Sequence, residues 1–182
     1  RMQSFEKTQS VIDGFRRHGV KSVNIDLVYG LPYQTRDSVE QTIEQVLSLE
    51  PDRVALFGYA HLPERLPHQR LIPEDHLPDA MDRFAQANRA ANTLVNAGYE
   101  RVGLDHFARP GDRLAGGEVR RNFQGYTTDD AGILIGFGAS AIGRLPQGYV
   151  QNAVATGEYQ RRIAAGELAT QRGHAMSKDD DV

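Results

Sequence analysis

The stretch "NIDLVYGLP" at residues 24–32 and the two segments that follow it decide the fold. It is a β-branched, apolar run that ends at a glycine and a proline, as a central strand does. Residues 36–53, "RDSVEQTIEQVLSLEPDR", place apolar side chains at helical spacing, with Asp37 or Ser38 expected to begin the helix. The second apolar run, "RVALFGYAHLP" at residues 53–63, completes a strand–helix–strand unit. Its length suits a parallel crossover, so the sequence predicts an α/β fold, either a β/α barrel or an open sheet.

The flanking segments continue the alternation of helices and strands. Helical periodicity and boundaries at glycine or proline predict helices at residues 4–18, 79–97 and 153–165, a short strand within residues 99–110 and a strand pair in "GRLPQGYV" at residues 143–150. Residues 111–130 are polar and rich in glycine, which is typical of loops.

Composition sets limits on the function. With 40% hydrophobic and 25% charged residues and a net charge of −3, the 182-residue chain has the profile of a soluble globular protein. No apolar run approaches the ~20 residues that cross a bilayer, so we expect a cytoplasmic protein with no membrane or nucleic-acid partner. There is no cysteine, which excludes disulfides and cysteine-ligated metal clusters held by this chain itself. The chain starts at Arg1 without an initiator methionine, and we expect it to be a piece of a longer protein.

Polar residues follow the predicted strands, at the edge where parallel α/β folds bind their ligands. They are Asp26, Tyr29, Tyr59, Ala60, His61, Asp105 and His106. For each of them except Asp26, a structural role as a capping or hydrogen-bonded residue is the favoured interpretation. Asp26 differs, because we expect it to be buried in its strand, and a buried carboxylate must be paired or bound to a polar ligand.

Other motifs carry weaker signals. Gly136, Gly138 and Ala141 match G-x-G-x-x-A, with Glu158 in the place of the acidic residue, but no βαβ unit continues as a dinucleotide site requires. The glycines more readily indicate close backbone approach to a ligand.

The chain also lacks two common catalytic signatures, the G-x-S-x-G elbow and the G-x-x-x-x-G-K phosphate loop. The histidines at positions 61, 68, 76 and 106 fit no metal-binding spacing, so we predict no metal site. Arg120 and Arg121 are too few for a nucleic-acid footprint but suit carboxylate groups on a small ligand.

Four longer strings carry a family resemblance. They are "NIDLVYGLPYQT" at residues 24–35, "YAHLPERLPHQR" at 59–70, "GLDHFARPGDRLA" at 103–115 and "RRNFQGYTT" at 120–128. In order and spacing the chain resembles oxygen-independent coproporphyrinogen III oxidase, also called coproporphyrinogen III dehydrogenase, of the radical SAM superfamily. The resemblance implies the second half of a partial (β/α)6, TIM-like barrel at residues 1–110. Residues 111–182 would then be a post-barrel extension leading toward a C-terminal helical domain.

The resemblance also assigns site residues and cofactors. The family binds two S-adenosylmethionine (SAM) molecules and a [4Fe-4S] cluster, whose C-x-x-x-C-x-x-C loop belongs to earlier strands that this chain does not contain. By position in the matching motifs, Arg1, Asp26 and Ala60 would meet the second SAM, Ile142 the cluster-bound SAM, and Phe123 and Gln124 the substrate and cofactor as an active-site loop.

The implied reaction converts coproporphyrinogen III to protoporphyrinogen IX. A 5′-deoxyadenosyl radical would abstract hydrogen from a propionate, which then loses CO2 and an electron to become a vinyl group. We expect a monomer, an unidentified electron donor and acceptor, and no activity in the isolated chain. Two alternatives stay open: a heme chaperone of the same superfamily, whose segments read more like "NFAKPG", and a non-catalytic α/β scaffold domain.

Overall fold

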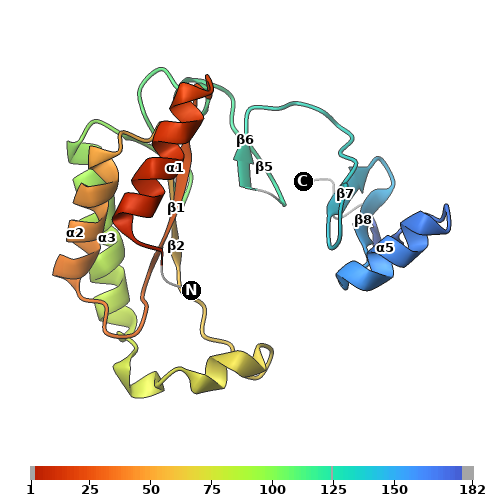
Figure 1. Ribbon diagram of the computed structural model, residues 1–182, viewed down its shortest axis with the longest axis horizontal. Coiled ribbons are helices and arrows are strands. Elements are labelled where there is room, and N and C mark those ends of the chain that lie inside the picture. The colour runs from red at the N-terminus through yellow and green to blue at the C-terminus, as the bar shows by residue number, and fades with distance from the viewer. Residues whose placement is uncertain (1–2, 124, 178–182) are drawn as a thin grey trace. The chain divides into compact units, whose positions relative to one another are not determined.

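The computed structural model describes residues 3–123 and 125–177, which fall into two compact units, Arg1–Val119 and Arg120–Val182 (Figure 1). The first unit contains the helices α1 (Phe5–Arg17), α2 (Arg36–Ser48), α3 (Ala80–Asn96) and α4 (Arg113–Gly116), the short 3-10 helices η1 (Pro67–Leu71) and η2 (Glu74–His76), and the strands β1 (Asn24–Tyr29), β2 (Arg53–Gly58), β3 (Glu100–Val102) and β4 (His106–Ala108). The second contains the strands β5 (Arg120–Asn122), β6 (Gly125–Thr127), β7 (Ile142–Leu145), β8 (Gly148–Asn152) and β9 (Thr170–Ala175) and the helix α5 (Thr156–Ala164). None of the described helices is long and apolar enough to cross a bilayer.

The strand–helix–strand unit has the predicted parallel form. β1 pairs with β2 in parallel from Asn24 opposite Arg53 to Tyr29 opposite Gly58, and α2 is the crossover. The α/β class predicted from the sequence is therefore confirmed. The sheet order is β1-β2-β4-β3, so β1 forms one edge.

The third strand differs from the prediction. Residues 99–110 form two short antiparallel strands, β3 and β4, joined by a turn at Gly103, and β4 pairs antiparallel with β2. The turn is possible because Gly103 adopts a φ of 61°, which glycine accepts without strain.

The helix boundaries follow side-chain capping. Ser4 caps α1 and Asp79 caps α3, each accepting a backbone N–H with its side chain, at the starts that the sequence predicts. The expected start of α2 at Asp37 or Ser38 is wrong. Thr35 is the cap, because its hydroxyl accepts from Ser38 N at 3.1 Å while the Ser38 hydroxyl accepts from Thr35 N at 2.9 Å. This reciprocal pair is a capping box.

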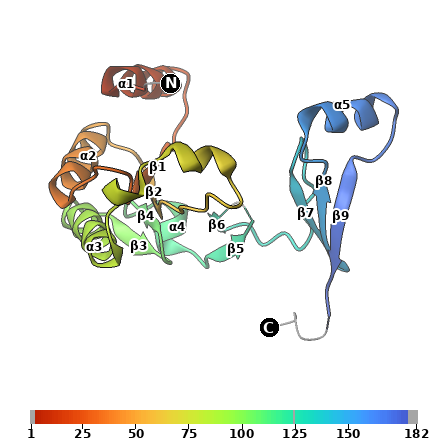
Figure 2. The same cartoon turned by 90° about the horizontal axis from the view of Figure 1, so that it is seen from below.

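The core of the first unit lies between the sheet and helices α2 and α3, which pack side by side on one face of it (Figures 1 and 2). The fully buried side chains include Ile43, Val54, Leu94 and Phe107. From β1, the side chains of Ile25, Leu27 and Tyr29 pack against this core. Since strand side chains alternate, the other residues of β1 point to the opposite face.

In the second unit, β7, β8 and β9 form an antiparallel sheet, and β5 and β6 form a hairpin. The strand pair predicted at residues 143–150 is confirmed as β7–β8, and α5 occupies Thr156–Ala164 within the predicted helix. The sequence did not predict β9, all six residues of which are exposed.

Candidate functional site

The open face of the four-stranded sheet carries a row of three residues at one level. Asp26 of β1 lies opposite Ala55 of β2, and Ala55 lies opposite His106 of β4. Paired residues point to the same face, so Asp26 and His106 flank a small alanine, two strand spacings apart, or roughly 10 Å. Asn24 donates to Asp26 Oδ1 at 2.6 Å, and Asp105 Oδ1 lies 2.7 Å from His106 Nδ1. At this level the face therefore carries polar groups, with a carboxylate at each side.

The expected burial of Asp26 is wrong. Asp26 is exposed, as are Asn24 and Val28 on the same side of β1, because the apolar side chains of this strand take the face that packs on the helices. A carboxylate on an uncovered face is hydrated, so its presence in the strand needs no ligand to explain it. The structure therefore shows Asp26 as an accessible hydrogen-bond acceptor on the edge strand of an open sheet.

The loop after β2 is held rigidly around Ala60. The buried side chain of Gln69 donates to Ala60 O at 3.0 Å and accepts from Leu62 N at 2.5 Å. Arg83 donates to Tyr59 O at 2.6 Å. Ala60 itself is exposed, so its small side chain stands on a fixed backbone at the strand end.

The same loop contains a chain of three polar side chains. His61 Nδ1 lies 3.1 Å from Tyr59 Oη, and His61 Nε2 lies 3.1 Å from Glu74 Oε1. This gives His61 the hydrogen-bonded structural role that its sequence position also allowed. Among the described residues no group of three or more His, Cys, Asp or Glu side chains is placed to hold a metal ion.

The loop after β1 is fixed by another buried glutamine. Gln86 of α3 is 1% exposed; its Oε1 accepts from Gly30 N at 2.9 Å and its Nε2 donates to Gln34 O at 2.7 Å. Gly30 has a φ of 83°, a conformation that side-chain-bearing residues rarely adopt. α3 therefore sets the path of the chain at the end of the strand that carries Asp26.

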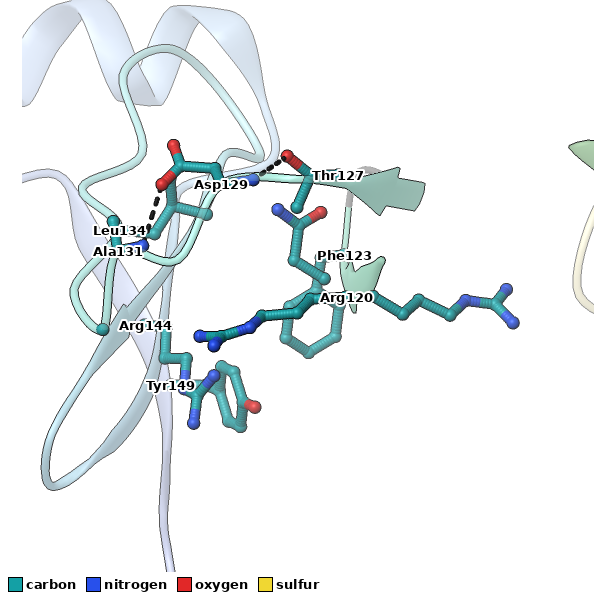
Figure 3. A pocket seen from close by; sticks show the side chains of 11 residues that line it. Arg120, Phe123, Thr127, Asp129, Ala131, Leu134, Arg144 and Tyr149 are labelled. Carbon is teal, nitrogen blue, oxygen red and sulfur yellow. Dashed lines mark hydrogen bonds between the residues drawn. The ribbon is translucent and has the colours of Figure 1, made fainter. Parts of the chain in front are cut away.

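The second unit contains a cavity of about 590 Å³ lined by residues of the β5–β6 hairpin, the following loop and strands β7 and β8 (Figure 3). Phe123 contributes to it and meets the ring of Tyr149 edge to face, with centroids 4.9 Å apart. Ile142 is half-buried in β7 and shares a strand face with Arg144, which lines the cavity. Gln124 and Arg1 lie outside the described residues.

Arg144 and Tyr149 were missed by the sequence reasoning. A hairpin signal was present in "RLPQGY", and its register places Arg144 directly opposite Tyr149. The glycine motif at residues 136–141 has no dinucleotide role in the structure, because β7 and not a helix follows it. The carbonyls of Gly136 and Gly138 instead each accept from Asn152 Nδ2 at 3.0 Å.

Comparison with known proteins supports the resemblance over the whole chain. It is 52% identical to the oxygen-independent coproporphyrinogen III oxidase of Bradyrhizobium diazoefficiens and 43% identical to that of Pseudomonas aeruginosa, over 99% and 100% of this chain respectively. A solved structure described as coproporphyrinogen III oxidase (HemN) from Escherichia coli, a radical SAM enzyme, matches 99% of this chain with a TM-score of 0.90 and 39% identity. The chain spans only 41%, 40% and 42% of these three proteins. No protein-family model matches it.

Proposed function

We propose that this chain, a homologue over its whole length of the oxygen-independent coproporphyrinogen III oxidases, is part of an enzyme that converts coproporphyrinogen III to protoporphyrinogen IX by radical SAM chemistry. The observation that carries the proposal is the match of fold and sequence together, a TM-score of 0.90 at 39% identity over 99% of the chain. Relatives at 52% and at 40% identity both carry the name oxygen-independent coproporphyrinogen III oxidase. We also propose that the reaction takes place in the cytoplasm.

We assign residues 1–110 to the second half of a partial (β/α)6 barrel and residues 111–182 to a post-barrel extension. The parallel β1–β2 pair with α2 as crossover supports the barrel assignment. The open sheet face supports it too, because Val28 and Phe57 are 42% and 38% exposed on the side away from the helices. A barrel interior would cover these apolar side chains.

The open face and the strand-end loops fit SAM. An accessible carboxylate such as that of Asp26 accepts hydrogen bonds from ribose hydroxyls, and Ala60 leaves space beside a fixed backbone. We assign these two residues, together with Arg1, to one SAM molecule and Ile142 to another. The binding of two SAM molecules is part of the proposal.

Radical initiation requires a reduced iron–sulfur cluster with bound SAM, which supplies a carbon radical able to remove hydrogen from the substrate. This chain has no cysteine and does not supply the cluster's thiolate ligands. Its own residues bind and orient: the sheet face holds a nucleoside, and Phe123 with Gln124 faces the substrate. The isolated chain is therefore expected to be inactive.

The test uses the full-length protein that contains this chain, purified anaerobically with its cluster. Incubation with coproporphyrinogen III, SAM and a reductant should yield one-vinyl and two-vinyl products on chromatography, with one CO2 released per vinyl group. Heme binding and transfer without any loss of CO2 would refute the oxidase and support the heme chaperone. If neither decarboxylation nor heme transfer is observed, both functions are refuted and the scaffold role remains.

A further inference from the structure

The cavity of the second unit concentrates positive charge in a chain of net charge −3. Arg120, Arg121 and Arg144 line it against a single acid, Asp129, for a formal charge of +2. Asp129 is turned to its own loop, because its Oδ1 accepts from Ala131 N at 2.8 Å (Figure 3). A cavity wall of this composition favours an anionic ligand.

The arginines come from two separate elements that meet at the cavity. Arg120 and Arg121 belong to β5, whereas Arg144 belongs to β7 and is fixed by a backbone bridge to Leu134, with Arg144 N donating to Leu134 O at 2.8 Å. Arg120 reaches the loop at Asp130, where Nη1 lies 3.5 Å from a carbonyl oxygen. A guanidinium has five N–H donors, so an arginine that keeps a backbone contact still has donors for a carboxylate.

Two aromatic rings, those of Phe123 and Tyr149, line the same cavity. The Phe123 and Tyr149 rings lie at an interplanar angle of 84°, and Arg144 lies beside Tyr149 (Figure 3). Within the described residues the Arg144 side chain makes no hydrogen bond or ion pair. The cavity of about 590 Å³ is in the size range of small-molecule sites, roughly 300–1,000 Å³. Arginines and aromatic rings that line one cavity suit a ligand with carboxylate arms on an aromatic or pyrrolic body.

We propose that this cavity is the carboxylate subsite of the substrate, in which Arg120 and Arg144 bind propionate arms of the porphyrinogen and the Phe123–Tyr149 pair contacts a pyrrole ring. The inference rests on the proposed function, which supplies the propionate-bearing ligand. It assigns binding to Arg144 and Tyr149, which the family resemblance did not single out.

The test compares Arg144→Gln and Arg120→Gln with Arg172→Gln in the full-length, cluster-loaded protein. Arg172 is an exposed arginine of β9 in the same unit that does not line the cavity. Loss of one charge-assisted contact should raise the KM for coproporphyrinogen III about tenfold in each cavity variant, with a smaller change in kcat. The KM of Arg172→Gln should stay within twofold of the wild-type value. Arg144→Lys keeps the positive charge but loses the planar guanidinium group, so its KM should lie between those of the wild type and Arg144→Gln.

A binding measurement separates recognition from chemistry. Coproporphyrin III, followed by its fluorescence, should bind the wild type more tightly than its tetramethyl ester does, and Arg144→Gln should remove most of that difference. The SAM affinity should not change in any variant. If the cavity variants keep the wild-type KM and the wild-type preference for the free acid while vinyl products form, the subsite is overturned and the proposed function stands. If no vinyl product forms in the wild type but the free-acid preference depends on Arg144, the proposed function fails and the carboxylate site stands.

Discussion

Replacing Gln86 by leucine should disconnect α3 from the loop after β1. The side chain is 1% exposed, and leucine has nearly the same size but neither donates nor accepts. The N–H of Gly30 and the carbonyl of Gln34 would both lose their partner. The Gly30 N–H is fully enclosed, so its loss costs about 1–3 kcal/mol, and the half-buried Gln34 carbonyl adds about 1.

Leucine buries more apolar surface than glutamine does, which offsets about 1 kcal/mol of this loss. The free energy of unfolding should therefore fall by about 1–3 kcal/mol in total. In urea the variant should therefore unfold at a lower midpoint, by the loss of free energy divided by the slope of the transition. Hydrogen exchange provides a local check, because the amide of Gly30 should lose protection in the variant. Both measurements are made on the full-length protein.

The matched control is Gln41→Leu, since Gln41 is exposed on α2 and this surface change should stay within about 0.5 kcal/mol. If Gln86→Leu behaves like Gln41→Leu in both experiments, the buried glutamine does not hold the loop and the reasoning is wrong.

Three further outcomes follow from the structure. Asp26→Ala should weaken SAM binding by the full-length protein about tenfold in calorimetry while leaving stability within about 0.5 kcal/mol, because this acid is exposed; unchanged SAM affinity and stoichiometry would contradict its assignment. Gly148→Ala should destabilise the β8–β9 pair by at least about 2 kcal/mol in thermal melting, since the new Cβ would lie 2.0 Å from a carbonyl oxygen of β9, whereas Gly157→Ala, with no atom within 4 Å, should be tolerated. The pKa of Glu158 is lowered by hydrogen bonds from Arg162 and from the neighbouring arginine, so its stabilisation of α5 is present above the ordinary carboxyl pKa and is lost as pH falls below about 4. Protection factors of α5 amides should therefore drop between pH 6 and pH 3 in the wild type and not in Glu158→Gln.

Local patterns predicted much of the first unit. Helical spacing with a glycine after each segment located α1 and α3, and the apolar runs at residues 24–32 and 53–63 located the parallel pair. These signals are strong because residue propensity, the spacing of apolar residues and the glycine or proline at the boundaries agree within each segment.

Burial was harder to predict than secondary structure. The apolar run at residues 24–32 was expected to be buried on both faces. In the structure only Ile25, Leu27 and Tyr29 of β1 pack on the core. The sequence of a strand does not state whether its second face is covered, because that depends on chain elements outside it. β9 escaped prediction for a related reason: "TQRGHA" has no apolar alternation, and its pairing with β8 determines its conformation.

The cavity of the second unit shows which residues of a site a sequence motif reveals. Arg120 and Arg121 drew attention as a pair of adjacent cations, whereas Arg144 stands alone in the sequence. Only the register of β7 against β8 and the bridge from Leu134 bring it to the same wall.

The position of β1 at the border of its sheet governs how this stretch of chain behaves when produced separately. Within the described residues it pairs with β2 alone, so every second residue of β1 directs its backbone N–H and C=O to the open side, where only the Val28 carbonyl has a hydrogen-bond partner, Gln34 Nε2 at 3.2 Å. An open strand edge of this kind pairs with extended segments of other chains. Recombinant material of these 182 residues should self-associate, and co-expression with the remaining part of the full-length protein should keep it dispersed.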